Sequence, residues 1–113
     1  MMTIKSHVWQ PPTDVYDTDN EIIVRVEIAG MNDTDFAIHL DQNVLVISGL
    51  RPDTTKRKAF QQMEIRFGEF VSQVELPVPI DTGKVEARYS NGFLYISLPK
   101  AQPRHINIIA KTE

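Results

Sequence analysis

The side chains that could bind a metal or transfer a proton are few in this 113-residue chain and do not form a familiar pattern. The three histidines stand far apart, and none has a second ligand at the spacing of a zinc site. Residues 17–21 resemble the start of a calcium loop. Counted from Asp17, however, the position that needs glycine is Ile22 and the position that needs a bidentate carboxylate is Ile28. We therefore expect no metal site.

Other kinds of catalytic or cofactor chemistry find equally little support. The chain has no cysteine, and its five glycines stand singly, so no phosphate-binding loop is indicated. No nucleophile, base and orienting group stand together in a recognisable motif. A basic triplet at 56–58 is better explained as a solvated loop, because the net charge is -3. We expect no catalytic residue, no cofactor and no nucleic-acid partner, and hence a protein that is not an enzyme.

Length and composition indicate one globular domain. Hydrophobic residues make up 42% and charged residues 24%, which is typical of a folded protein and argues against global disorder. No apolar run approaches the roughly 20 residues needed to cross a bilayer, so no membrane partner is expected. The first residues lack the apolar stretch of a secretory signal. We expect a cytoplasmic protein.

Apolar residues that alternate with polar ones predict an all-β fold. In residues 22–28, for example, every second side chain from Ile22 to Ile28 is aliphatic and shares one face. Residues 59–65 could form a short strand or a helical turn. Seven to eight short antiparallel strands at regular spacing predict a β-sandwich. The other expected strands are 15–16, 36–40, 44–49, 70–76, 85–89 and 93–98.

The last two expected strands flank Asn91-Gly92, the strongest short signal for a β-hairpin. Together, Ala87, Asn91, Gly92 and Leu94 form a hairpin signature that resembles the alpha-crystallin domain of small heat shock proteins. Further blocks resemble that domain in the same order, and the bacterial and plant form of the family in particular: 14–17, 26–31, 44–51, 64–70 and 74–77.

This resemblance implies an immunoglobulin-like β-sandwich that acts as a homodimer. It divides the chain into a short arm (1–8), the domain (9–100) and a C-terminal extension (101–113). In the bacterial and plant form, the loop after the central strand exchanges a short strand with the partner subunit. Here that loop would be 52–63. A partner strand satisfies the backbone groups of an exposed sheet edge. The implied dimer contacts are Val15, Tyr16, Ala59, Phe60 and Met63.

In the extension, Ile106 and Ile108 resemble the family's Ile-x-Ile anchor. Two isoleucines on one side of an extended peptide suit a pair of apolar pockets beside a sheet edge. The alternatives are a frayed or self-packed terminal strand for the tail, and ordinary core positions for the groove residues on strand 36–40. The expected groove, which would also suit client proteins, is Phe36, Ile38, Leu40, Val85, Ala87 and Tyr89.

The function implied by the resemblance is that of an ATP-independent chaperone. Such a holdase binds unfolding proteins through hydrophobic surfaces and prevents their aggregation during stress. An alternative is a non-catalytic assembly module for one specific protein partner. Because the family usually carries a long hydrophobic arm and only eight residues precede Trp9, we expect the dimer to form, but a large cage-like assembly is doubtful.

Overall fold

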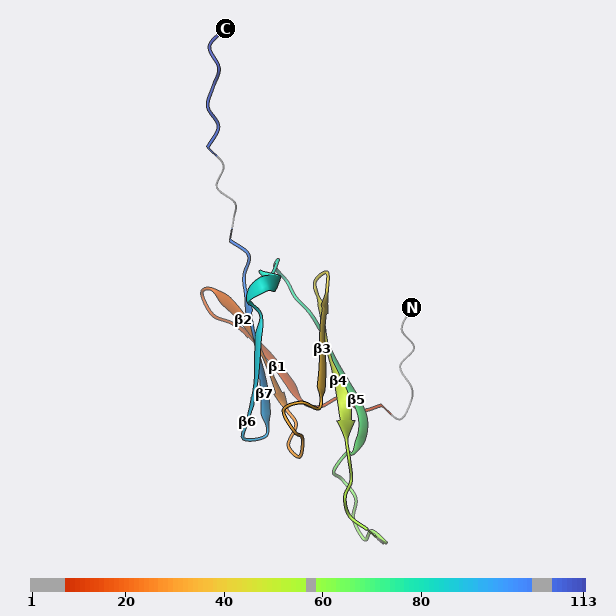
Figure 1. The fold of residues 1–113 in the computed structure, drawn as a ribbon. Coiled ribbons are helices and arrows are strands. Elements are labelled where there is room, and N and C mark those ends of the chain that lie inside the picture. The colour runs from red at the N-terminus through yellow and green to blue at the C-terminus, as the bar shows by residue number, and fades with distance from the viewer. Residues whose placement is uncertain (1–7, 57–58, 103–106) are drawn as a thin grey trace.

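The fold consists of two antiparallel β-sheets stacked as a sandwich. The computed structural model describes residues 8–56, 59–102 and 107–113, which contain seven strands and one short 3₁₀ helix. Figure 1 shows the two layers side by side, with a long loop projecting beyond one end of the sandwich and the C-terminal segment leading away from the other. In the described part of the chain, no helix is long and apolar enough to cross a membrane.

The first sheet has four strands in the order β1-β2-β7-β6. Its N-terminal hairpin is formed by β1 (Thr13–Asp17) and β2 (Glu21–Glu27), and its C-terminal hairpin by β6 (Glu86–Ser90) and β7 (Phe93–Pro99). The two hairpins meet where β2 pairs with β7. The edge strands of this sheet are therefore β1 and β6.

The second sheet has three strands in the order β3-β4-β5. These are β3 (Phe36–Asp41), β4 (Val44–Arg51) and β5 (Gly68–Glu75), and a short 3₁₀ helix (Thr82–Lys84) precedes β6. The seven strands confirm the predicted all-β sandwich. Within the single chain, residues 59–65 form neither of the two expected elements, a strand or a helical turn. No strand of this chain pairs with them, so their backbone lacks the ladder that defines a strand.

The inward faces of both sheets form one hydrophobic core. Ile22, Val24 and Val26 on β2 lie opposite Leu98, Ile96 and Leu94 on β7, and these side chains are buried. This alternation of buried and exposed residues confirms the predicted face of residues 22–28. In the second sheet, Gly49 leaves the space that Phe70 fills, since a Cβ on Gly49 would lie 2.8 Å from the Phe70 ring. The core residues of the second sheet are Leu45, Ile47, Phe70 and Val74.

One side of the sandwich is closed by the segment that precedes β1. The Trp9 backbone bridges to β5, donating to the Glu69 carbonyl at 3.1 Å and accepting from the Val71 amide at 3.0 Å. The chain then crosses to the first sheet, where the Thr13 and Ser72 hydroxyls are 2.8 Å apart. This bond satisfies Ser72, a buried polar residue, and joins β1 to β5. The sheets are thus tied together along their β1–β5 side.

The Asn-Gly hairpin has the geometry that its sequence predicts. Ser90 pairs with Phe93, so Asn91 and Gly92 form a two-residue turn with φ angles of 53° and 82°. Two successive positive φ values match a type I′ turn, which suits the twist of the flanking strands. The Gly92 carbonyl also accepts a hydrogen bond from the Ile28 amide at 2.8 Å. The turn is thereby attached to the end of β2 as well as to β6 and β7.

We expect Gly92→Ala to lower the free energy of unfolding by about 1–3 kcal/mol, because a residue with a Cβ is strained at the positive φ that Gly92 adopts. The added Cβ would also lie 3.2 Å from the Cβ of Ala29. Urea unfolding followed by circular dichroism measures the change. Asn91→Gly is the control, since glycine adopts positive φ without strain. Equal midpoints for the two variants would contradict this account of the turn.

Candidate protein-binding site

A hollow of about 460 Å³ lies on the side of the sandwich opposite the Trp9 segment, between edge strands β3 and β6. Phe36 and Ile38 line it from β3, and Ala87 and Tyr89 line it from β6. The Phe36 and Tyr89 rings are 5.2 Å apart between centroids, so the two sheets meet at the floor of the hollow. The family resemblance led us to expect these four residues in one groove, and the structure places them around one hollow.

The two other predicted groove residues lie next to the hollow and not in its lining. Leu40 and Val85 are half-buried and pack against the core. The face of β3 that the sequence left undecided is now assigned: Phe36, Ile38 and Leu40 point inward. They are core residues and groove residues at once, because β3 is an edge strand and its inward face is only partly covered.

A hydrogen bond holds the β6 wall of the hollow. The Tyr89 hydroxyl donates to the Ile28 carbonyl at 2.7 Å, across the open end of the sandwich. Leu94 of the hairpin signature is buried behind this wall and also contributes to the lining. Sequence reasoning missed three polar residues of the lining. The one indication of them in the sequence is that they lie next to or near predicted groove residues in the chain. They are Asp33, Thr34 and Arg88.

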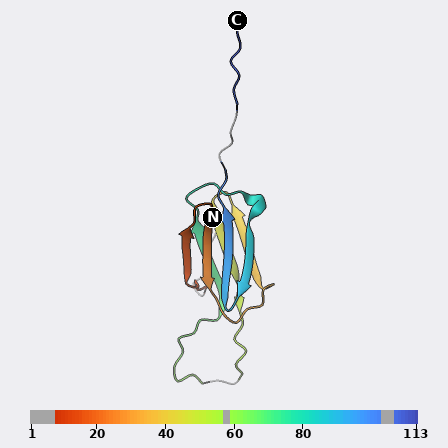
Figure 2. The ribbon, with the colours of Figure 1, turned by 90° about the vertical axis from the view of Figure 1, so that its left-hand side faces the viewer.

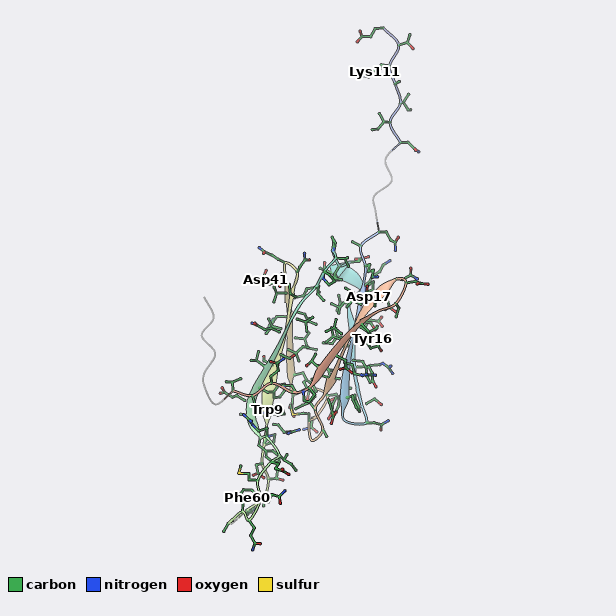
Figure 3. The ribbon with its side chains drawn as sticks, turned by 180° about the vertical axis from the view of Figure 1, so that it is seen from behind. Trp9, Tyr16, Asp17, Asp41, Phe60 and Lys111 are labelled. Carbon is green, nitrogen blue, oxygen red and sulfur yellow. The ribbon has the colours of Figure 1, made fainter. Side chains whose placement is uncertain are left out.

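A second exposed apolar region is divided between edge strand β1 and the loop that joins β4 to β5. Val15 and Tyr16 on β1 are 45% and 42% exposed, although both are large and apolar or aromatic. In the loop, Phe60 and Met63 are 48% and 65% exposed. Figure 2 shows this loop spreading out beyond the sheets, and Figure 3 places Phe60 near its far end, well away from Tyr16. The predicted dimer contacts, which include the exposed Ala59, do not meet within one chain.

The C-terminal extension begins at a fixed point. The Lys100 ammonium lies 3.1 Å from the Asp17 carboxylate and donates to the Thr18 carbonyl at 3.1 Å. Ile108 is 88% exposed, so in the described structure it packs against no part of the sandwich. Ile106, the other predicted anchor residue, lies outside the described residues.

The ion pairs found among the described residues lie on the surface. Asp14 accepts a hydrogen bond from Arg25 on the outward face of the first sheet, and this bond raises the pKa of the Arg25 guanidinium. Within residues 8–56, 59–102 and 107–113, no three His, Asp or Glu side chains form a group that could hold a metal ion. The surface therefore presents apolar edges and a shallow groove, which can bind polypeptide through backbone pairing and apolar contacts.

A two-sheet sandwich with apolar, partly uncovered edges defines a class of protein-binding domains. Comparison with known proteins then assigns the family. The model of the Hsp20/alpha crystallin family matches residues 14–110. The chain belongs to this family, the small heat shock proteins, as its sequence signature predicted. Because members of the family are non-enzymatic chaperones, membership also confirms the expectation that the chain is not an enzyme.

Individual relatives agree with this assignment. The chain is 33% identical over 94 residues to small heat shock protein C2 of Rickettsia felis, and the match covers 81% of this chain. Heat shock protein 16.0 from Schizosaccharomyces pombe has a similar structure, with a TM-score of 0.76, 27% identity and coverage of 94% of this chain and 77% of that one. A small heat-shock protein from Xylella fastidiosa is also similar in structure, with a TM-score of 0.74 and 27% identity. That match covers 90% of this chain and 98% of the Xylella chain. The match spans only 61% of the length of the Rickettsia protein.

We expect Tyr89→Phe to lower the free energy of unfolding by about 1 kcal/mol, because the carbonyl of the buried residue Ile28 loses its donor. Tyr95→Phe is the matched control, since Tyr95 lies on the outward face of β7, where its ring stacks with Arg88. Chemical denaturation of both variants tests this. The β6 wall would not depend on the hydroxyl if the two substitutions had the same effect.

Proposed function

We propose that this chain is an ATP-independent holdase of the cytoplasm. It would bind apolar surface on unfolding proteins, prevent their aggregation under stress and release them to ATP-driven chaperones. Family membership over residues 14–110 carries the proposal. The described structure supports it, because apolar side chains are exposed along edge strand β1 and the β4–β5 loop and line the hollow between β3 and β6. A holdase needs no cofactor, since binding to the unfolded state is sufficient to reduce aggregation.

The proposed functional unit is a homodimer formed by loop exchange. β1 pairs with β2 on one side only, and its outer edge offers the backbone groups to which another strand can add. Residues 59–63 of a partner would supply that strand, with Phe60 and Met63 contacting Val15 and Tyr16. This arrangement would cover Phe60 and Met63, which are 48% and 65% exposed in the described structure.

The proposed higher assembly uses the tail and the hollow. Ile106 and Ile108 would enter the hollow of a neighbouring dimer, with Phe36, Ile38 and Tyr89 as its apolar walls and the small Ala87 leaving room. Burying two isoleucines contributes roughly 3–6 kcal/mol before the ordering cost is subtracted. Each contact is therefore weak, and several must act together. The small heat-shock protein from Xylella fastidiosa is described as having a distinct high order structure.

The holdase proposal predicts that the chain suppresses aggregation of a heat-labile client. Light scattering of the client at its unfolding temperature should fall when the chain is present at an equimolar amount, and ATP should make no difference. An inert protein at the same mass concentration is the control for crowding. Unchanged scattering would contradict the holdase function, and selective capture of one folded protein would instead favour an assembly module.

The tail proposal predicts that damage to either side of the contact lowers the assembly mass. Ile106→Ala with Ile108→Ala removes the anchor, and Ala87→Arg fills the hollow from its exposed β6 wall. Both should leave dimers when mass is measured by light scattering after gel filtration. Ser90→Arg is the matched control, because it adds the same charge on the other face of β6. Masses equal to the wild type for both test variants would contradict a tail that binds this groove.

A further inference from the structure

The inference concerns Arg51, the last residue of β4, at the base of the loop that the proposed dimer exchanges. Arg51 lies opposite Gly68, the first residue of β5, so this pair marks where the β4–β5 ladder ends and loop 52–67 begins. In Figure 3 the labelled Trp9 lies near this base, whereas Phe60 lies near the far end of the loop. Arg51 and Trp9 thus lie where the loop leaves and rejoins the sheet.

The Arg51 guanidinium is held between two aromatic rings. Its Cζ lies 4.6 Å from the centroid of the Trp9 ring and 5.2 Å from the centroid of the Phe67 ring. Trp9 belongs to the segment that closes the β1–β5 side of the sandwich, and Phe67 is the last residue of the loop. Stacking of a planar cation on aromatic faces is favourable, and arginine does this better than lysine.

Hydrogen bonds from the same guanidinium join two further backbone segments. Nε donates to the Arg66 carbonyl at 2.9 Å, and a terminal nitrogen donates to the same oxygen. The other terminal nitrogen donates to the Ala29 carbonyl at 3.3 Å, in the connection between β2 and β3. The planar guanidinium of arginine has several N–H donors in fixed directions, so it can bond to both carbonyls while it stacks on the rings. The ammonium of a lysine could not make the paired hydrogen bonds and the stacking contacts together.

Trp9 is in turn fixed to the start of β5. Its indole Nε1 donates to the Gly68 carbonyl at 3.3 Å, in addition to its backbone bonds with β5. Gly68 has a φ of 94°, so the chain turns sharply as the loop returns to the sheet. Arg51 thus contacts Arg66 and Phe67 just before Gly68, and Trp9 bonds to Gly68 itself. The N-terminal segment and the end of the loop are therefore held by the same group of contacts.

We infer that Arg51 is a positioning residue for dimer exchange: it clamps Trp9, Ala29 and residues 66–67 together and so directs loop 52–67 toward the partner. This inference rests on the proposed loop-exchange dimer. A loop held at its base has fewer orientations to lose when it binds, and pre-organisation of this kind increases affinity. Without the clamp, the apolar residues of the loop remain, but they must be ordered by the partner alone.

The test compares dimer affinity in Arg51→Met, Arg51→Lys and a matched control, Arg88→Met. Arg88 also stacks on a ring, with its Cζ 4.8 Å from the Tyr95 centroid, but it lies on β6, away from the loop. It lines the hollow proposed for the tail, which takes no part in the proposed loop exchange. All chains carry Ile106→Ala and Ile108→Ala, so that tail contacts do not contribute. Sedimentation over a dilution series gives the dissociation constant, and hydrogen exchange reports separately on loop 52–67 and on β2 and β7.

We expect Arg51→Met to weaken the dimer at least about tenfold relative to Arg88→Met, as the loss of charge-assisted hydrogen bonds to a positioning group would do. Exchange should become faster in the loop and stay unchanged in β2 and β7. Trp9 is the only tryptophan, so its emission should shift in the Arg51 variants and not in Arg88→Met. Arg51→Lys should also weaken the dimer, because it keeps the charge but loses the paired hydrogen bonds.

The outcomes separate this inference from the proposed dimer. If the parent chain with an intact Arg51 is a monomer at every concentration, the loop-exchange dimer fails, and the inference fails with it. If the parent dimerises and Arg51→Lys or a folded Arg51→Met dimerises as tightly, the dimer stands and the positioning role is overturned. Equal weakening by Arg51→Met and Arg88→Met also overturns it, because loss of stability alone would then explain both.

Discussion

The arrangement of this structure depends on which edge strands of its two small sheets are covered and which are left open. The four-stranded sheet has edge strands β1 and β6, and the three-stranded sheet has edge strands β3 and β5. Each edge strand has a row of backbone N–H and C=O groups that no neighbouring strand in its sheet pairs with. The β5 edge is covered by the bridge from Trp9. On the opposite side, β3 and β6 stand apart enough to leave the hollow. The edge of β1 is where the proposed partner loop would add. The fold is stable inside because its inward faces match, and its incompletely covered edges are the surfaces that the proposed contacts would use.

The C-terminal extension begins beside the end of β1, the strand that would receive the partner loop. Lys100, where the C-terminal extension begins, contacts Asp17 and Thr18 at the end of β1. The strand that would receive the partner loop is thus connected to the starting point of the tail. At the opposite end of the sandwich, the Trp9 ring lies over Arg51, at the base of the exchanged loop. Both extensions of the domain therefore begin next to elements of the proposed dimer contact.

Local sequence pattern predicted most of the fold because strands and tight turns depend on neighbouring residues. Alternation identified the inward face of β2, and Asn91-Gly92 identified the hairpin between β6 and β7, whose turn has positive φ angles. Alternation alone did not show which non-consecutive strands pair, such as β2 with β7, because that depends on how the whole chain folds. It also could not assign residues 59–65, which pair with none of the strands in the described part of the chain. The family resemblance placed the expected groove between β3 and β6, where the structure has a hollow, whereas the exact lining depended on how far the inward face of β3 is covered.

The Arg51 cluster shows why long-range polar contacts escape sequence analysis. Arg51 contacts Trp9, Ala29 and Arg66, which are distant in the chain and show no common spacing. Its sequence signal is a single arginine at the end of a β-branched strand, which on its own indicates only a solvated charge. Only the folded backbone brings the carbonyls and rings around it, and only there does the planar guanidinium differ from any other cation. In a domain that binds through weak apolar edges, such contacts contribute by limiting the directions in which the apolar segments can point. Affinity in such an assembly then depends on orientation as much as on buried area.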